Sequence, residues 1–278
     1  MDIFPAPAKL NLFLHVIGCR EDGYHLLQTV FRFIDHSDLL RFDITYDGVI
    51  RHANLIPGLT ETDDLCVRAA KLLRQQSGNT SLGVTIHLEK NIPLGGGLGG
   101  GSSDAATTLI ALNRLWKVGW KRECLMALGL ELGADVPVFI YGRNAFAEGV
   151  GEELHAIDLP PAWYVVLTPP VQISTAAVFA SKELTRNTIP IKMAAFSMGQ
   201  GHNDLEPVAI HMQPVIAEWL EWLKKQYGVA KVAMSGSGAC VFAEFHSESA
   251  AREVFGRLPG DMSGFVVSGL ESHPLSDF

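Results

Sequence analysis

Hydrophobic positions in the first half of the chain alternate in some stretches and recur at helical spacing in others. Leu10, Leu12, Leu14 and Val16 alternate with other residues, which is typical of a strand. By the same criterion, strands are predicted at 8–16, 26–34, 38–44 and 84–88. Helices are predicted at 65–75, 103–116 and 121–132, the first ending near Gly78 and the third at Gly133.

The pattern breaks at Pro160 and Pro161, and we place a domain boundary there, dividing the chain into 1–158 and 159–278. The second half is predicted to contain strands at 163–167, 229–234, 240–245 and 264–268 and helices at 207–227 and 248–258. Residues 185–201 form the least regular segment and are expected to be a mobile loop. Helices mixed with short strands predict an α+β architecture in both halves.

Composition narrows the class of protein. The 278 residues are 47% hydrophobic and 19% charged, which is typical of a soluble globular enzyme. A formal charge of −8 without a basic stripe argues against a nucleic-acid partner. The N-terminus lacks the basic and apolar regions of a signal peptide, and no apolar run is long enough to span a membrane. We therefore expect a cytoplasmic protein without a membrane partner.

The four cysteines are Cys19, Cys66, Cys124 and Cys240, and they are far apart with no C-x-x-C pair. This spacing suggests neither a zinc site nor a disulfide framework. The histidines are equally scattered and form neither H-E-x-x-H nor H-x-H. Reduced cysteines in the cytosol fit this pattern best.

A glycine-rich loop between a predicted strand and a predicted helix carries the strongest chemical signal. Residues 93–104 contain six glycines, so the backbone can approach an anion closely and point its N–H groups inward. The two serines add hydroxyls for phosphate or magnesium. A flexible linker is the alternative, but linkers do not occupy strand-to-helix junctions. The candidate ATP-binding residues are Pro93, Leu94, Gly95, Gly96, Gly97, Leu98, Gly99, Gly100, Gly101, Ser102 and Ser103.

Three known phosphate loops do not fit this segment. A Walker A loop requires a lysine that is absent here. Gly95-x-Gly97-x-x-Gly100 matches the dinucleotide fingerprint only weakly, because the expected acidic residue would fall inside the predicted helix 121–132. The H-R-D and D-F-G motifs of protein kinases are missing as well.

The loop resembles that of the GHMP kinase superfamily, which includes galactokinase, homoserine kinase and mevalonate kinase. Four more segments carry the resemblance further, and they are Pro7–Leu12, Asp22–His25, Gly133–Pro137 and Ser235–Gly238. They resemble one branch of the superfamily, which implies a cytidine-diphosphate-linked methylerythritol as the acceptor, in the non-mevalonate isoprenoid pathway. Together they cover almost the whole chain in the right order.

The resemblance implies a fold and a reaction. The expected fold is a two-domain GHMP kinase, with an N-terminal domain like the second domain of ribosomal protein S5 and a ferredoxin-like C-terminal domain. The expected reaction transfers the γ-phosphate of ATP, with Mg²⁺, to the 2-hydroxyl of the polyol. A monomer or weak homodimer is expected.

The resemblance also implies catalytic roles. Asp135 would accept the proton of the acceptor hydroxyl, and Lys9 would be the cation beside it. Asn11 leaves the same face of the strand as Lys9 and would orient the sugar hydroxyl or the lysine. Each residue has a structural alternative: a helix N-cap for Asp135, a solvated edge position for Lys9 and a polar edge position for Asn11.

Aromatic residues are implied at the other end of the substrate. Tyr24 and His25 would meet the cytosine, by stacking and by a hydrogen bond to its edge. Phe179 would be the second stacking partner, and Thr175 belongs to a Ser-Thr pair that resembles a diphosphate-contacting turn. The alternative for Phe179 is a core position. The turn at 235–238 would lie near substrate and phosphate, or would be only a hairpin.

One position departs from the family pattern. Asp64 precedes Leu65 where the family often has asparagine near the adenine, and aspartate offers only acceptors. The adenine contact therefore stays open, and no metal ligand is assigned. Two other functions remain as alternatives: a homoserine- or mevalonate-type kinase, and a non-catalytic nucleotide-binding protein. The aromatic residues argue against the first, and intact Lys9 and Asp135 argue against the second.

Overall fold

The computed structural model describes residues 2–53, 63–196 and 201–278, and two β-sheets organise this part of the chain. The first sheet has the order β3-β4-β2-β5-β6, with β1 paired to β2. Its strands are β1 Phe4–Cys19, β2 His25–Thr45, β3 Ile50–His52, β4 Gly83–Glu89, β5 Ala145–Glu148 and β6 Glu153–Ala156. The second sheet has the order β10-β7-β9-β8, with β7 Trp163–Leu167, β8 Lys231–Met234, β9 Val241–Phe245 and β10 Gly264–Ser268.

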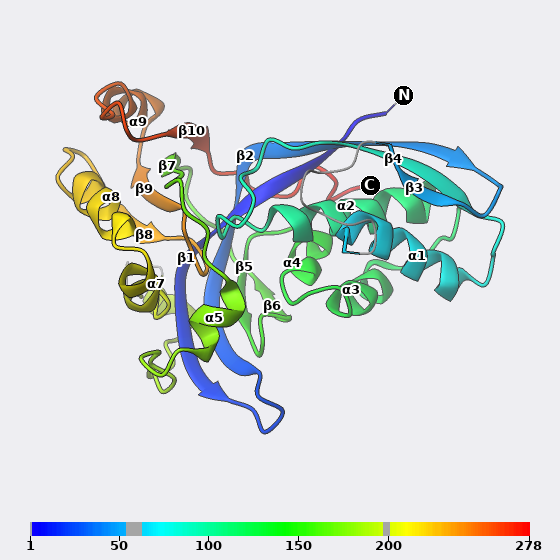
Figure 1. Cartoon of the computed structure of the whole chain (residues 1–278), viewed down its shortest axis with the longest axis horizontal. Coiled ribbons are helices and arrows are strands. Elements are labelled where there is room, and N and C mark those ends of the chain that lie inside the picture. The colour runs from blue at the N-terminus through cyan, green and yellow to red at the C-terminus, as the bar shows by residue number, and fades with distance from the viewer. Residues whose placement is uncertain (1, 54–62, 197–200) are drawn as a thin grey trace.

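Helices accompany both sheets, which confirms the predicted α+β class. Those of the first half are α1 Leu65–Ser77, α2 Gly100–Leu115, α3 Arg122–Leu130 and α4 Val136–Tyr141. Those of the second half are α5 Thr175–Ala180, α6 Met193–Phe196, α7 Glu206–Met212, α8 Val215–Lys224 and α9 Glu248–Phe255. Figure 1 shows α1 to α4 gathered on one side of the molecule and α8 and α9 on the other.

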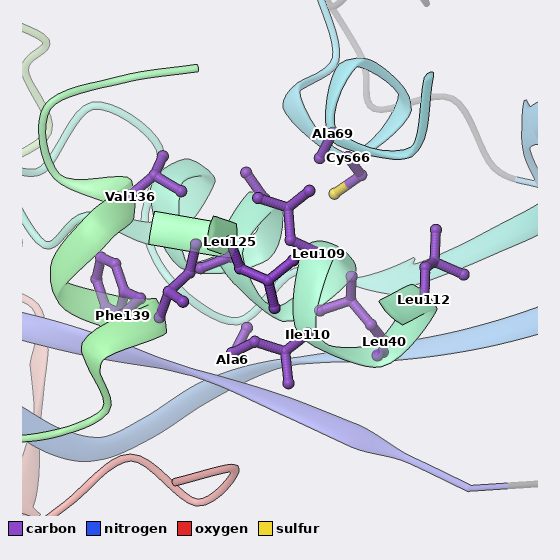
Figure 2. Close-up of a cluster of buried hydrophobic side chains, with 14 of the residues drawn as sticks. Ala6, Leu40, Cys66, Ala69, Leu109, Ile110, Leu112, Leu125, Val136 and Phe139 are labelled. Carbon is purple, nitrogen blue, oxygen red and sulfur yellow. The ribbon is translucent and has the colours of Figure 1, made fainter. Parts of the chain in front are cut away.

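The core of the first half forms around α2. Leu109, Ile110 and Leu112 of this helix are buried together with Leu125 of α3 and Phe139 of α4 (Figure 2). This packing buries the apolar face that predicted the helix, and burial of such side chains stabilises by about 1.5–3 kcal/mol each. The glycine loop is the segment that leads into α2, so the core fixes the position of the loop.

The separate strands predicted at 26–34 and 38–44 are wrong, because the structure has one long strand, β2. Its partner β1 shifts register so that Pro7 opposes Ser37 and the next residue, Ala8, opposes Ile34. The resulting bulge accommodates the polar pair Asp35 and His36 within one continuous strand.

Three helix predictions need correction. The predicted helix 207–227 is two helices, since Pro214 lacks the N–H that would continue α7 and instead precedes α8. The helix predicted from 103 begins at Gly100, inside the glycine loop. Gly133 does not cap α3, which ends at Leu130 with Glu131 in the right-handed conformation.

The segment between β6 and β7 contains the predicted boundary between 1–158 and 159–278, which stays a prediction. The expected loop 185–201 includes α6, and its residues 197–200 lie outside the described residues. Among the helices that the structure describes, none is long and apolar enough to cross a membrane.

Candidate active site

A cavity of about 700 Å³ lies between the glycine loop, β1, the start of α4, α5 and the turn at 235–238. It is lined by residues of both halves of the chain. Of the predicted site residues, Ser103 is buried in α2, and the rest line the cavity. They are Lys9, Asn11, Tyr24, His25, residues 93–102, Asp135, Thr175 and Phe179. The structure thus brings together side chains that are far apart in sequence, and their roles stay predictions.

Lys9 and Asp135 form an ion pair in the lining of this cavity. The ammonium of Lys9 lies 3.3 Å from Oδ2 of Asp135 and 5.4 Å from the ring centroid of Phe31. Lys9 is only 2% exposed, whereas the side chain of Asp135 is 38% exposed. The pair therefore combines a buried cation with a carboxylate that an incoming hydroxyl can reach.

Asp135 occupies the position before α4, but its carboxylate does not cap the helix. Its backbone is right-handed helical, with φ −84° and ψ −11°, and its side chain makes no capping hydrogen bond within the described chain. The structural alternative for this residue is therefore not realised. The carboxylate stays available to the cavity and to Lys9.

Asn11 also contacts the ammonium of Lys9. Its Oδ1 accepts a hydrogen bond from Lys9 Nζ, and its Nδ2 donates to Thr29 Oγ1 at 2.9 Å. Because Asn11 is buried and both of its polar atoms are engaged, its orientation is fixed. This geometry supports the role of orienting the lysine.

The glycine loop is held in place by the turn that precedes β9. Ser235 Oγ donates to the Gly97 carbonyl at 3.0 Å, and the Cys240 backbone N–H donates to the Gly96 carbonyl at 3.1 Å. Gly97 has φ +75°, and a Cβ there would lie 2.1 Å from the Ser235 carbonyl oxygen. Close packing of two backbones and a left-handed conformation both require glycine. The loop is therefore not a linker.

Replacing Gly97 with alanine is expected to lower the free energy of unfolding by at least about 2 kcal/mol, because the methyl group must displace backbone. The matched control is Gly95→Ala, which has a similar φ of +68° but whose Cβ would meet only Gln172 at 3.9 Å. That control should show only the conformational cost of about 1–2 kcal/mol. Urea unfolding of both variants measures the difference. Equal losses would contradict the contact with Ser235.

Aromatic side chains and one threonine line a second part of the cavity, which we call its far end. The rings of His25 and Phe179 lie with centroids 5.0 Å apart and planes at 34°, and Tyr24 beside them is 62% exposed. Burial, followed by the nearby Arg186, lowers the pKa of His25. The hydroxyls of Thr175 and Ser237 are 2.7 Å apart, so α5 is joined to the turn at 235–238.

Sequence reasoning missed a buried charge cluster behind the glycine loop. Lys90 lines the cavity, and its ammonium donates to Asp38 and, at 2.8 Å, to Asp104. Burial, partly opposed by Lys90, raises the pKa of Asp104 to about 8. The available signal was a charged residue on the buried side of a predicted helix, two positions after Ser102.

This cluster predicts a pH-dependent stability. Asp104 is 3% exposed and its pKa rises from 3.8 to about 8 on folding, so folding takes up a proton between these values. Stability from this group therefore falls as the pH rises from about 4 to about 8. In Asp104→Asn, the stability relative to wild type should rise with pH, by up to about 1.4 kcal/mol per unit. Urea unfolding at pH 5 to 8 measures this.

The control for that measurement is Asp261→Asn, which changes an exposed aspartate. Its stability difference from wild type should not vary over the same pH range. A constant difference for Asp104→Asn as well would contradict proton uptake at Asp104 on folding.

Asp64, the departure from the family pattern, caps α1. Its carboxylate accepts hydrogen bonds from the backbone N–H groups of Cys66 at 2.8 Å and Val67 at 3.1 Å. Aspartate and asparagine cap helices about equally well, which explains why aspartate is tolerated. The next residue, Leu65, lines the cavity, whereas Asp64 is not among the described lining residues.

Comparison with known proteins shows the family of the chain. Residues 64–143 match the model of the GHMP kinases N terminal domain, and residues 183–263 match that of the GHMP kinases C terminal. The chain is similar over its full length to proteins named 4-diphosphocytidyl-2-C-methyl-D-erythritol kinase. The identity is 89% to that of Nitrosomonas europaea and 79% to that of Nitrosomonas eutropha, each over 100% of both chains.

Solved structures extend the comparison to the fold. A crystal structure of 4-(cytidine 5'-diphospho)-2C-methyl-D-erythritol kinase is 34% identical, with a TM-score of 0.82, and covers 96% of this chain and 99% of its own. A mevalonate kinase, at 17% identity and a TM-score of 0.69 over 97% of this chain and 99% of its own, shares the fold. These likenesses confirm the two-domain fold expected from the sequence. The chain belongs to the GHMP kinase family, in its 4-diphosphocytidyl-2-C-methyl-D-erythritol kinase branch.

Proposed function

We propose that this protein transfers the γ-phosphate of ATP to the 2-hydroxyl of 4-diphosphocytidyl-2-C-methyl-D-erythritol, in the non-mevalonate route to isoprenoid precursors. The observation that carries the proposal is the Lys9–Asp135 pair, which lies in one cavity with a glycine-rich phosphate loop. The names of the full-length relatives support the same substrate.

The proposed mechanism divides the work between two side chains and the loop. Asp135 accepts the proton of the acceptor hydroxyl, and Lys9 stabilises negative charge on the group in transfer. Backbone N–H groups of residues 95–101 hold the phosphates of ATP. A weak base suffices, because the phosphoryl group passes through a loose transition state that mainly requires orientation and charge stabilisation.

Magnesium is proposed to enter with ATP. Among the described residues, no group of three or more His, Cys, Asp or Glu could hold a metal ion. Mg²⁺ commonly uses substrate phosphates together with one or two protein oxygens. Ser102 and Asp135 both line the cavity, so their side-chain oxygens fit such a role. The ion would neutralise phosphate charge.

The far end of the cavity supports a cytidine-linked acceptor. Tyr24 and Phe179 offer aromatic faces for stacking, and His25 offers a ring nitrogen for the edge of the base. Thr175 is proposed to contact the diphosphate. Homoserine and mevalonate have no base, so these residues would serve no purpose for either acceptor.

The test is ADP release by the purified protein with ATP and Mg²⁺ against a panel of acceptors. The panel contains 4-diphosphocytidyl-2-C-methyl-D-erythritol, methylerythritol phosphate, homoserine, mevalonate and galactose. Activity with the cytidylated acceptor alone is the expected result. Activity with a small acceptor would support the kinase chemistry but contradict the proposed acceptor. ATP binding with no turnover would favour a non-catalytic role.

Four further expectations belong to this proposal. The protein is proposed to work in the cytoplasm, without nucleic-acid or membrane partners, as a monomer or weak homodimer. Sedimentation at several concentrations tests the oligomeric state. The boundary between 1–158 and 159–278 is tested by limited proteolysis.

A further inference from the structure

Arg186 lies outside the predicted site and connects His25 to the end of α5 and to the segment that follows it. Arg186 Nε donates to His25 Nε2 at 3.0 Å. Its Nη2 donates to the carbonyls of Phe179 at 2.8 Å and Ser181 at 2.7 Å, and its Nη1 donates to that of Leu184 at 3.1 Å. The guanidinium therefore has a fixed position, set by the end of α5 and the segment after it.

This position determines which nitrogen of His25 carries a proton. A guanidinium has only donors, so the Nε2 atom that faces it must be an acceptor. A neutral imidazole with a bare Nε2 has its proton on Nδ1. A doubly protonated ring would set two N–H groups against each other. The lowered pKa of His25 agrees, because both burial and the charge of Arg186 favour the neutral ring.

The consequence is a hydrogen-bond donor presented at the site of the base. His25 lines the cavity beside Tyr24 and Phe179, and no other hydrogen bond of its ring occurs within the described residues. Nδ1–H is therefore free to donate to a ligand. N3 of cytosine is an acceptor, whereas N3 of uracil carries a proton and cannot accept. A fixed donor opposite N3 thus favours cytosine.

We propose that Arg186 is a positioning residue that fixes the Nδ1–H tautomer of His25 and thereby sets the preference of the cavity for cytosine over uracil. This inference rests on the proposed function, which supplies the base. The main-chain contacts of Arg186 also hold Phe179 at its distance from His25. One side chain therefore sets both the donor and the stacking face.

The first test is the tautomer of His25 in the free protein, observed by long-range ¹⁵N–¹H NMR of the imidazole. Wild type should show a protonated Nδ1 and a bare Nε2. In Arg186→Met the ring should shift toward the Nε2–H form, which is the preferred form of free histidine. The control Arg257→Met removes an exposed arginine of the second half and should leave the spectrum unchanged. An Nε2–H ring in wild type would overturn the proposal.

The second test uses CMP and UMP as probes of the base site, measured by calorimetry. Arg186→Met should reduce the ratio of CMP affinity to UMP affinity by about tenfold. This is the expected effect of losing one neutral hydrogen bond to N3 of cytosine and of removing the clash of two N–H groups at N3 of uracil. If Arg186 has a purely structural role, its removal would weaken the binding of both nucleotides equally and leave the CMP/UMP affinity ratio unchanged. That result would overturn the specificity role. With the proposed substrate, KM should rise while kcat changes little.

A double-mutant cycle links the two side chains. His25→Asn replaces the ring with an amide whose donor does not depend on a tautomer. In that background, Arg186→Met should change the CMP/UMP ratio much less than in wild type. An unchanged effect would show that Arg186 acts independently of His25. The NMR and CMP readouts need no turnover, so a failure of the acceptor panel is distinguishable from a failure of this proposal.

Discussion

Replacing Asp135 with asparagine is expected to lower turnover by at least ~100-fold, the low end of the contribution of a general base. Asparagine keeps the size of the side chain but cannot take the proton of the acceptor hydroxyl. ATP binding should be retained, because the glycine loop is held by Ser235 and Cys240 and not by Asp135. Steady-state kinetics and ATP titration by calorimetry measure the two effects separately.

The control for this experiment is Asp158→Asn, which changes a fully exposed aspartate paired with Arg143. Its turnover should match that of wild type. Near-normal turnover of Asp135→Asn would remove this residue from the mechanism. Lost ATP binding would instead indicate that the carboxylate has a structural role in the nucleotide site.

Replacing Lys9 with methionine is expected to reduce turnover by about 10²–10³-fold, as observed when a preorganised group that stabilises transition-state charge is removed. The free energy of unfolding should fall by about 1–3 kcal/mol, mainly because Asn11 Oδ1 stays buried without its donor. Methionine fills the apolar space beside Phe31. The carboxylate of Asp135, which loses its ion-pair partner, is exposed enough to be hydrated. The expected signature is a large kinetic loss in a folded protein, measured by kcat and by urea unfolding.

Lys71→Met, on the exposed side of α1, is the matched control and should leave both quantities unchanged. The double variant of Lys9 and Asp135 adds a sharper criterion. If the two residues act as a unit, removing both should cost about as much as the worse single change. Fully additive losses would show that the ion pair is not a functional unit.

Strong local signals in the sequence predicted much of the candidate site. Six glycines between a strand and a helix predicted the phosphate loop, and the structure places residues 93–102 along one cavity with Lys9 and Asp135. The strand at 163–167 was correctly located, because continuous apolar residues end at clear breaks. These features depend on residues close together in sequence.

Features that depend on distant partners were missed. The β5–β6 hairpin contains alanine and glutamate, which are weak strand formers, and pairing with β2 determines its structure. The short helix α5 is too brief for helical periodicity to appear. Arg186 lies in an irregular segment, and only the fold reveals its contact with His25, 161 positions away.

The phosphate loop has a consequence for biosynthesis. Residues 93–104 leave the ribosome long before Ser235 and Cys240, whose hydrogen bonds hold Gly97 and Gly96. A nascent chain therefore has the sequence of the proposed nucleotide site without the contacts that shape it. The N-terminal part folds first in most proteins made of two parts. If ATP binds in the proposed site, it gains its full binding surface, and can stabilise the protein by mass action, only when translation is nearly complete.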